Sequence, residues 1–366
     1  MEKTNDASRA TGGASSRPLR IAQIAPLYER VPPKLYGGTE RVVSNITEEL
    51  VRRGHEVTMF ASGDSITRAK LSPGYPTALR LAGIPELGTF IQLPMISDVY
   101  EGAEDRFDII HSHIDYWSFP FARLVSVPTV ATMHGRLDID DLRPIYHRYR
   151  SVPAVSISDA QRVPLQFMNW VETIYHGLPR DLLHFSPNPG KYLAFLGRIS
   201  PEKRPDLAIE VARKVGIPLK MAAKVDVVDR AYFETVIEPR LSPPDIEYIG
   251  EINEVEKSEF LGNAIALMFP IDWPEPFGLT MIESMACGTP VVARPFGSVR
   301  EIIKPEVSGV IASTVDEMVA AVRKAATLSR AGCRAEFEAR FSADVMVDNY
   351  VRVYRRLIAQ GHTPVK

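Results

Sequence analysis

Residues 274–293 read Pro-Glu-Pro-Phe-Gly-Leu-Thr-Met-Ile-Glu-Ser-Met-Ala-Cys-Gly-Thr-Pro-Val-Val-Ala, and this stretch decides the fold. It begins with a turn rich in proline and glycine and continues as a segment of helix-forming residues, 279–286. A Gly-Thr-Pro turn and a short apolar strand, 291–293, complete it. A helix that leads directly into a buried apolar strand is the repeating unit of a parallel sheet with helices on its faces.

Two carboxylates stand out within this stretch. Glu275 lies just before the predicted helix, and Glu283 lies in its middle. Each carboxylate can bind a pair of hydroxyl groups, and the free amides of residues 277–280 at the helix start can bind an anion. Hydroxyl groups beside a phosphate are the chemistry of a nucleotide sugar, so the stretch predicts a site for such a ligand.

The alternation of strand and helix extends in both directions from this stretch. It predicts an α/β fold with two parallel, doubly wound sheets of the Rossmann type. Helices are expected near residues 206–215 and 343–357, the latter capped by Ser342. The expected strands are Leu19–Ala25, Val57–Ala61, Asp108–His111, Thr129–Met133, Ala154–Ile157, Val171–Ile174, Tyr192–Leu196, Leu219–Ala222, Ile246–Ile249, Ala266–Phe269, Val291–Ala293 and Val310–Ile311.

A chain of 366 residues is too long for one ordinary core and favours two domains. A proline-rich passage interrupts the alternation and is typical of a linker. We therefore expect a disordered tail at residues 1–17, a first domain at 18–178, a linker at 179–190, a second domain at 191–340 and a C-terminal helix within 341–366.

The composition limits the partners of the protein. A net charge of −2 gives no global reason to expect nucleic acid or an anionic membrane as the main partner. Two cysteines support neither a disulfide framework nor a zinc cluster, and they favour a reducing compartment, so we expect a cytoplasmic protein. No apolar run is long enough to span a bilayer, which leaves at most peripheral contact with a membrane.

Two further segments offer groups for phosphate. Arg198 and Lys203 follow a predicted strand, at the sheet edge where open α/β sheets bind ligands, and together they suit a diphosphate. Gly37 and Gly38 open the first helix, where a backbone can approach a ligand closely. Each pair also has a simpler interpretation: the two cations can be solvated loop residues, and the two glycines can form a structural turn. No Gly-x-Gly-x-x-Gly follows the first strand, which argues against a nicotinamide dehydrogenase.

Histidines follow two of the predicted strands. His134 comes at the carboxyl end of 129–133, on the ligand side, although a histidine at such a place is as often structural as functional. His111 and His113 form a His-Ser-His segment at the end of another strand. With no third ligand identified, a metal site there is improbable, and we expect no metal.

The chain resembles the family-four retaining glycosyltransferases of the GT-B type. The resemblance rests on a series of residues in the family's order: Gly37-Gly38, His134, Gly197-Arg198, Lys203 and the segment from Glu275 to Glu283. The resemblance covers the chain from about residue 19 to residue 357. Its strongest part is the Glu-x₇-Glu segment with the Gly-Thr-Pro-Val-Val-Ala that follows. It implies two Rossmann-like domains that face each other across a cleft, with a C-terminal helix that crosses back to the first domain.

The resemblance also implies a role for each matching residue. Glu275 would bind hydroxyls of the donor sugar, and Glu283 the ribose. Arg198 and Lys203 would neutralise the diphosphate, and His134 would line the sugar pocket near the reacting centre. The backbone would contact the sugar–phosphate part of the donor at Phe277, Gly278 and Leu279 of the second domain, and at Gly37 and Gly38 of the first.

The implied reaction moves a hexose from a nucleoside diphosphate sugar, UDP rather than GDP, to an acceptor hydroxyl with retention of the anomeric configuration. Protein cations supply the charge, so no metal or other cofactor is expected. The acceptor stays open between a small molecule, a glycan and a lipid-linked molecule. The first domain is expected to provide most of its pocket, and the loops between residues 64 and 102 of that domain carry no recognisable motif. A sugar-nucleotide epimerase or hydrolase of the same architecture, and a catalytically silent nucleotide-sugar binding protein, are the alternatives.

Three segments depart from the family pattern. Arg204-Pro205 stands where a glycine usually follows the lysine, Gly297-Ser298-Val299-Arg300-Glu301 replaces a common Gly-Gly-x-x-Glu, and residues 175–178 read Tyr-His-Gly-Leu where Asn-Gly is frequent. None of these changes removes a group assigned to the phosphate or the ribose. They are expected to reshape the sugar or acceptor pocket.

Overall fold

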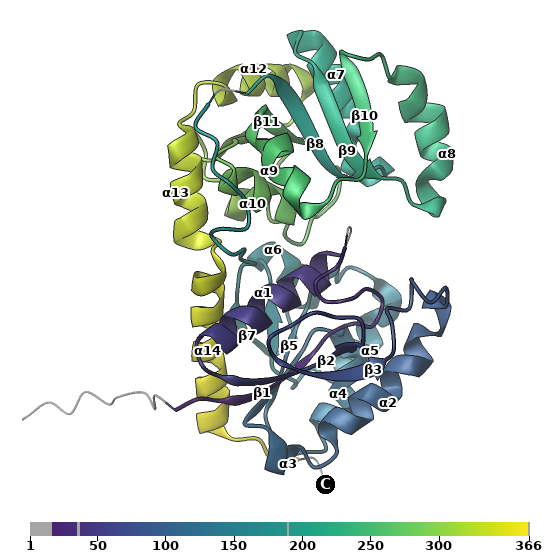
Figure 1. Cartoon of the computed structure of the whole chain (residues 1–366), viewed down its shortest axis with the longest axis vertical. Coiled ribbons are helices and arrows are strands. Elements are labelled where there is room, and N and C mark those ends of the chain that lie inside the picture. Colours follow the sequence, from purple (N-terminus) through teal and green to yellow (C-terminus); the bar gives the residue numbers. More distant parts are fainter. Residues whose placement is uncertain (1–16, 35–36, 189, 365–366) are drawn as a thin grey trace, which may run out of the picture.

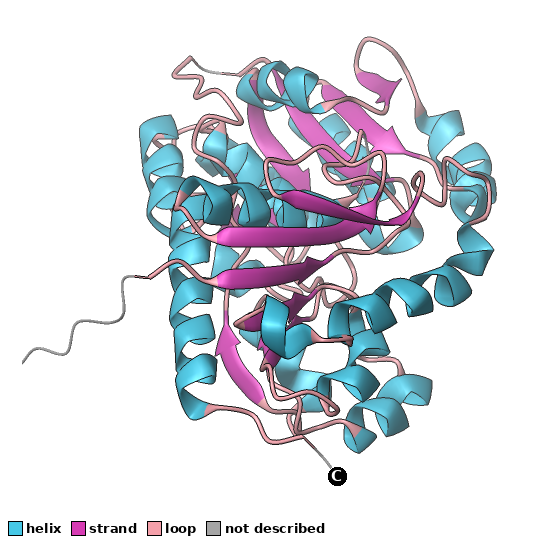
Figure 2. Ribbon diagram, turned by 60° about the horizontal axis from the view of Figure 1, so that its bottom comes forward, coloured by secondary structure: helices cyan, strands magenta, loops and turns pink. Residues whose placement is uncertain are grey.

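Two parallel sheets, one in each half of the chain, form the frame of the molecule (Figure 1). The computed structural model describes residues 17–34, 37–188 and 190–364. The predicted disordered tail, 1–17, therefore lies outside the described residues, apart from Arg17. Figure 2 shows the strands of both sheets enclosed by helices, which is the α/β architecture expected from the sequence.

The first sheet has seven parallel strands in the order β3-β2-β1-β4-β5-β6-β7. The central strands are buried along almost their whole length, which is why they appear in the sequence as continuous apolar runs. The strands are β1 (Arg20–Ile24), β2 (Glu56–Ser62), β3 (Lys70–Tyr75), β4 (Ile109–Ser112), β5 (Thr129–Thr132), β6 (Ala154–Ser156) and β7 (Trp170–Thr173).

The second sheet has six parallel strands in the order β10-β9-β8-β11-β12-β13. Its strand order reverses direction between β8 and β11, which neighbour each other, and ligands bind beside such a reversal in open α/β sheets. The strands are β8 (Tyr192–Arg198), β9 (Leu219–Lys224), β10 (Ile246–Gly250), β11 (Ala264–Phe269), β12 (Val291–Ala293) and β13 (Gly309–Ile311).

Helices cover both faces of each sheet. The predicted helix at 279–286 is α10, which begins and ends at those residues. The α-helices are α1 (Gly38–Arg52), α2 (Gly88–Tyr100), α3 (Ala103–Arg106), α4 (Phe119–Ala122), α5 (Arg143–Arg148), α6 (Asp159–Arg162), α7 (Pro205–Val215), α8 (Arg230–Tyr232), α9 (Glu254–Gly262), α10 (Leu279–Ala286), α11 (Val299–Ile302), α12 (Val315–Ala325), α13 (Arg330–Arg340) and α14 (Ala343–Gln360). Short 3-10 turns lie at Pro85–Leu87, Asp115–Ser118, Asp140–Leu142, Val163–Leu165, Pro201–Lys203, Val227–Asp229 and Glu238–Arg240, and a π turn at Phe233–Ile237.

The last helix belongs to the core of the first domain although it follows the second domain in sequence. In Figure 1, α13 runs along the second domain and α14 continues along the first. One side of α14 packs with α1 and with one face of the first sheet in a single apolar cluster. Side chains that α14 buries in this cluster are Met346, Val347, Tyr350, Val353, Tyr354 and Leu357. Burial of large side chains contributes about 1.5–3 kcal/mol each, so α14 is an integral layer of the first domain.

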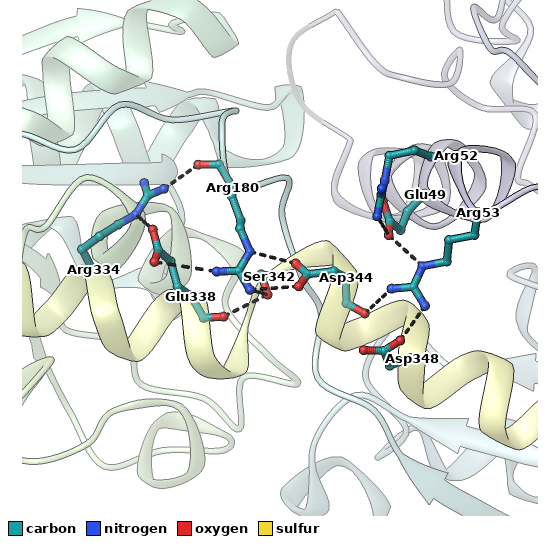
Figure 3. A network of polar contacts seen from close by, with 9 residues as sticks. All are labelled: Glu49, Arg52, Arg53, Arg180, Arg334, Glu338, Ser342, Asp344 and Asp348. Atoms are coloured by element: carbon teal, nitrogen blue, oxygen red, sulfur yellow. Dashed lines mark hydrogen bonds and ion pairs between the residues drawn. The ribbon is translucent and has the colours of Figure 1, made fainter.

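Arginines fasten the start of α14 to its surroundings (Figure 3). Arg180 donates to Asp344 at 3.1 and 2.9 Å, and Arg53 at the end of α1 donates to the Asp344 carbonyl at 2.8 Å and to Asp348 at 2.5 Å. The predicted cap is wrong in one respect: Ser342 occupies the N-cap position, but its hydroxyl donates to the Glu338 carbonyl and accepts no helix amide. The Ser342 hydroxyl is bonded to a carbonyl of the preceding helix, α13, instead of an amide of α14.

Candidate active site

A cavity of about 570 Å³ lies between the two domains, at the carboxyl ends of both sheets. Side chains or backbone of both domains line it. Predicted site residues in this lining are Gly37, Gly38, His134, Arg198, Lys203, Glu275, Phe277, Gly278 and Leu279. Glu283 lines an adjoining cavity of about 120 Å³ instead. The two cavities share Gly37 and Gly38 on one side and Leu279 on the other, so they form one continuous site.

Glu275 and Lys203 form an ion pair at the wall supplied by the second domain. The indole N–H of Trp273 donates to the same carboxylate oxygen at 3.1 Å, and the Lys203 ammonium lies 4.9 Å from the centre of the indole ring. Glu275 is 9% exposed, so its carboxylate is fixed by these partners rather than by water. The chain therefore presents a carboxylate and a cation side by side, each able to exchange its partner for a ligand.

The start of helix α10 faces this ion pair. Its N-cap is Gly278 in the left-handed conformation, with φ of 82°, and no side chain caps the first amides. A Cβ on Gly278 would lie 3.0 Å from the Phe269 ring, so a glycine is required for both conformation and space. An uncapped helix start combined with a lysine and an arginine is suited to a phosphate group.

Glu283 and Lys257 form a second ion pair, at 2.6 Å, inside the smaller cavity. Their side chains are 3% and 12% exposed. The lining of this cavity includes Lys224 at the end of β9, and Glu251 and Ile252 directly after β10. A hydroxyl pair on a ligand can reach Glu283 here, beside the start of α10.

Arg198 extends from the end of β8 into a group of carboxylates. It pairs with Glu202, and its guanidinium lies 3.7 Å from Asp226 and 3.6 Å from Asp229. Burial raises the pKa of Asp229, and the charge of Arg198 opposes that rise. Arg198 and Lys203 are thus not solvated loop cations, because carboxylates hold each of them at the cavity.

The first domain approaches α10 with its glycine pair. Gly37 has a φ of 155°, and a Cβ there would lie 2.7 Å from Pro33. A Cβ on Gly38 would lie 3.4 Å from a methyl group of Leu279 in the other domain. Larger residues at these positions would therefore alter both the turn and the width of the site. Glu40, one turn into α1, is buried at the same place, and burial raises its pKa to about 7.

His134 lies on the cavity wall of the first domain, at the end of β5. Burial lowers its pKa to about 3, so the ring is neutral. Its Nε2 lies 2.9 Å from Nδ1 of His113, and its ring stacks on His176 with a centroid separation of 5.2 Å. His111 and His113 are buried and hydrogen-bonded to other side chains. Over residues 17–34, 37–188 and 190–364, no three His, Cys, Asp or Glu side chains are grouped as a metal site requires.

Sequence reasoning missed several residues of the site. Asp115 lies in the cavity lining with a φ of 49°, and its Oδ1 is buried without a partner. Burial raises its pKa to about 6, opposed by a backbone hydrogen bond from His134. Asp115 follows β4 as His134 follows β5, and that shared position is the signal that would have found it. Lys257 and Trp273 carry no such signal, because neither belongs to a motif and each contributes through its contact with a motif residue, Glu283 and Glu275 respectively.

The remaining wall of the cavity is mixed in character. The first domain contributes aromatic and cationic side chains there, namely Tyr28, Arg80, Trp117 and Arg136. Arg80 and Gln92 come from the loops and helix between residues 64 and 102 of the first domain, the domain that we expected to provide most of the acceptor pocket. Within the residues that the structure describes, no helix combines the length and the apolar character needed to cross a membrane.

Comparison with known proteins gives a consistent result. Residues 36–179 match the family model "Glycosyltransferase Family 4", and residues 184–341 match "Glycosyl transferases group 1". The D-inositol 3-phosphate glycosyltransferase of Mycobacterium marinum is 31% identical over 97% of this chain and 89% of its own.

Two solved structures share the fold. The sucrose-phosphate synthase of Thermosynechococcus elongatus superposes with a TM-score of 0.74 at 18% identity, covering 93% of this chain and 99% of its own. The Anabaena protein HepE, solved in complex with UDP and glucose, superposes with a TM-score of 0.70 at 17% identity, covering 93% and 100%. At these identities the likeness establishes the architecture of two facing Rossmann-like domains.

Proposed function

This chain belongs to glycosyltransferase family 4, and we propose that it transfers a hexose from a nucleoside diphosphate sugar to an acceptor hydroxyl with retention of the anomeric configuration. The observation that carries the proposal is the convergence, in one continuous site, of groups from both domains. Gly38 faces the uncapped start of α10, with Lys203 and Glu275 beside it. A donor placed across this site has its phosphates beside the cation and the helix amides and its hydroxyl groups beside the carboxylates.

Donor binding exchanges one ion pair for two ligand contacts. In the structure Lys203 and Glu275 neutralise each other. We propose that the diphosphate takes the ammonium of Lys203 while a sugar hydroxyl donates to Glu275, with Trp273 keeping the carboxylate oriented at 3.1 Å. The ribose hydroxyls donate to Glu283, which Lys257 holds at 2.6 Å. The carboxylates thus serve as fixed acceptors and the cations as fixed charges.

Departure of the diphosphate is the difficult step, because negative charge grows on it as the sugar becomes oxocarbenium-like. Arg198, Lys203 and the first amides of α10 stabilise that charge without moving, and such preorganised electrostatics are commonly the largest catalytic contribution. We propose that this protein charge replaces a divalent cation. Retention follows if the acceptor attacks from the face that the diphosphate leaves, with the leaving phosphate taking the hydroxyl proton.

The nucleotide and the acceptor are proposed from the relatives and from the charge of the cavity wall. UDP is favoured because the neighbour HepE was solved with UDP and glucose. The M. marinum relative is named for D-inositol 3-phosphate, and Arg80 and Arg136 line the first-domain wall here. An anionic polyol is therefore the first acceptor to test, before a glycan or a lipid-linked molecule. We place the activity in the cytoplasm, since Cys287 and Cys333 are free and buried.

The first experiment is a thermal-shift screen with UDP, GDP and their sugars, because a ligand of the folded state raises the apparent stability. Turnover with and without acceptors, followed by NMR of the anomeric proton, then separates transfer with retention from epimerisation and hydrolysis. Tight binding of a donor with no turnover of any kind would favour the catalytically silent binding protein.

Lys203→Ala tests the phosphate assignment. We expect kcat to fall about 10²–10³-fold, the usual cost of one preorganised charge or donor. Lys214→Ala is the matched control, because Lys214 pairs with Asp316 on the surface of the same domain, away from the cavity. Turnover of Lys203→Ala at the wild-type level would overturn the assignment. Loss of activity with a chelator, restored by magnesium, would overturn the metal-independent mechanism.

A further inference from the structure

A chain of hydrogen bonds runs from His134 into the interior of the first domain. His134 Nε2 lies 2.9 Å from His113 Nδ1, and His113 Nε2 lies 2.7 Å from the side-chain oxygen of Gln23. The amide nitrogen of Gln23 donates to the hydroxyl of Tyr354 at 3.4 Å. Gln23, His113 and Tyr354 are at most 2% exposed, so water does not compete for these bonds.

The series of hydrogen bonds continues beyond Tyr354. The Tyr354 hydroxyl lies 2.6 Å from His111 Nδ1, and His111 Nε2 lies 2.7 Å from the Thr132 hydroxyl. That hydroxyl in turn lies 2.9 Å from the hydroxyl of Tyr350. Both tyrosines come from α14, the helix that crosses back from the second domain. The network therefore connects the cavity wall to helix α14.

Each histidine in the network is neutral, and this determines which atom donates in each of the hydrogen bonds that involve His113 and His134. Burial lowers the pKa of His111 and His113 well below the usual range and that of His134 to about 3. A neutral imidazole has one N–H and one acceptor nitrogen. Because the Gln23 oxygen accepts, His113 donates from Nε2 and keeps Nδ1 as an acceptor. His134 must then donate from Nε2, and its Nδ1 carries a lone pair.

We propose that Gln23, His113 and Tyr354 are positioning residues that hold His134 in the Nε2–H tautomer, so that its Nδ1 accepts a hydrogen bond from a hydroxyl of the bound sugar or acceptor. The sugar part of this inference rests on the proposed function. The tautomer part concerns the free protein and stands on the network alone.

The unpartnered atom supports this direction. His134 Nδ1 is buried and has no hydrogen-bond partner. With the reversed direction it would carry an N–H without an acceptor, and orphaned buried N–H groups are rarer than unused acceptors. The ring cannot turn freely to relieve the atom, because it stacks on His176, whose ring in turn lies 4.8 Å from that of Phe277 in the second domain. A hydroxyl that enters the cavity beside His134 supplies the missing donor.

Nitrogen NMR of the wild-type protein, labelled with ¹⁵N-histidine, tests the tautomer directly. The eight histidines are separated by comparison with His134→Gln, which removes the signal in question. We expect His134 to show a protonated Nε2 and an unprotonated Nδ1, and the Nδ1 resonance to shift when a donor sugar is added. A protonated Nδ1 in the free protein would overturn the proposal.

Gln23→Met tests the positioning role, because methionine keeps the length of the side chain and removes both polar atoms. His113 then loses its fixed acceptor, so we expect both tautomers of His134 and a fall in kcat/KM of about tenfold, the effect of one weakened hydrogen bond. Tyr100→Phe is the matched control, since it removes a buried hydroxyl that bonds to Thr129 outside the network.

The outcomes separate the two ideas. An unchanged His134 tautomer in Gln23→Met would overturn the positioning role. If Gln23→Met failed to fold, Tyr354→Phe would be used instead, because it releases the Gln23 amide and is expected to produce the same mixture of tautomers. If the wild-type protein transferred no sugar, the proposed function would fail, while the NMR measurement would still decide the tautomer.

Discussion

Replacement of Lys257 by methionine is the most direct test of how the nucleotide end of the site is built. Lys257 and Glu283 pair at 2.6 Å, and their side chains are 12% and 3% exposed. Methionine fills a similar volume but leaves the Glu283 carboxylate buried without its cation. Glu254, 3.5 Å from Lys257, would lose the same partner.

The size of the effect follows from this burial. Removal of one member of a buried ion pair costs about 3–5 kcal/mol, because the remaining charge stays desolvated. Since Lys257 retains some exposure, we expect the lower end, about 3 kcal/mol. For a domain of this size, each kcal/mol lowers Tm by roughly 2–4 °C, so the transition of the second domain should fall by about 6–12 °C.

Differential scanning calorimetry of the wild type, Lys257→Met and the double variant Lys257→Met/Glu283→Gln measures this. The double variant removes the uncompensated charge, and we expect it to regain most of the lost stability. A fall of less than 2 °C in Lys257→Met, or a double variant as unstable as the single one, would show that the pair is not the buried interaction described.

Three other substitutions address separate parts of the site. In Gly297→Ala the new Cβ would overlap the backbone of Glu275, so we expect at least a tenfold loss of kcat/KM, while Gly332→Ala on a helix stays near wild type. Glu40→Gln removes a group whose folded pKa, about 7, lies above its unfolded value of 4.5. Between pH 4.5 and 7 the folded wild-type protein binds more protons than the unfolded one, so its free energy of unfolding falls as the pH rises. Relative to Glu40→Gln, we expect the wild type to lose roughly 3 kcal/mol of this free energy over that range. Curves of unfolding free energy against pH that run parallel for the two proteins would refute this. Asp115→Asn should lower kcat no more than about tenfold with retention unchanged; abolished turnover would instead make this carboxylate a base or nucleophile.

Most strands are predictable from the sequence, including the edge strands β7, β10 and β13, which lie within one residue of the expected bounds. β1, β4, β5 and β8 are buried apolar runs, and each was expected within two residues of its observed bounds. The edge strand β3 was missed, since it contains Pro73 and Gly74, pairs with β2 alone and is partly exposed. Burial on both faces gives a strand a continuous apolar run, and β3 lacks such a run because it is partly exposed and contains Pro73 and Gly74.

The same limit applies to the site. Glu275, Lys203 and Arg198 belong to segments that a resemblance can match, so the sequence indicated that they belong together. It could not indicate that Lys203 pairs with Glu275 or that Lys257 pairs with Glu283, because those contacts depend on the folding of one domain around its cavity. The histidine network is harder still to predict, since its members come from three strands, β1, β4 and β5, or the residues just after them, and from the last helix.

Two of the contacts between the domains involve glutamates of the second domain. Arg41 of α1 forms an ion pair with Glu254 at the start of α9, next to the smaller cavity. Glu301 of the second domain accepts hydrogen bonds from the amides of Asp159 and Ala160 at 2.7 and 2.8 Å, at the start of α6 in the first. Because Glu254 also contacts Lys257, the partner of Glu283, a ligand that alters the Glu283 pair acts on a contact between the domains.

The chain passes between the domains twice, and both passages meet at one place. The amide of Leu178 donates to the Phe341 carbonyl at 2.9 Å, and the amide of Ala343 donates to the Leu178 carbonyl at 2.8 Å. A Cβ on Gly177 would overlap the backbone of Ser342, so the two segments lie in direct contact. Since α14 is fastened to the first domain and α13 lies along the second, any change in cleft width must bend the chain at this pair of segments. A bend at these segments would leave the hydrogen bonds of the histidine network intact, because that network lies wholly within the first domain and α14.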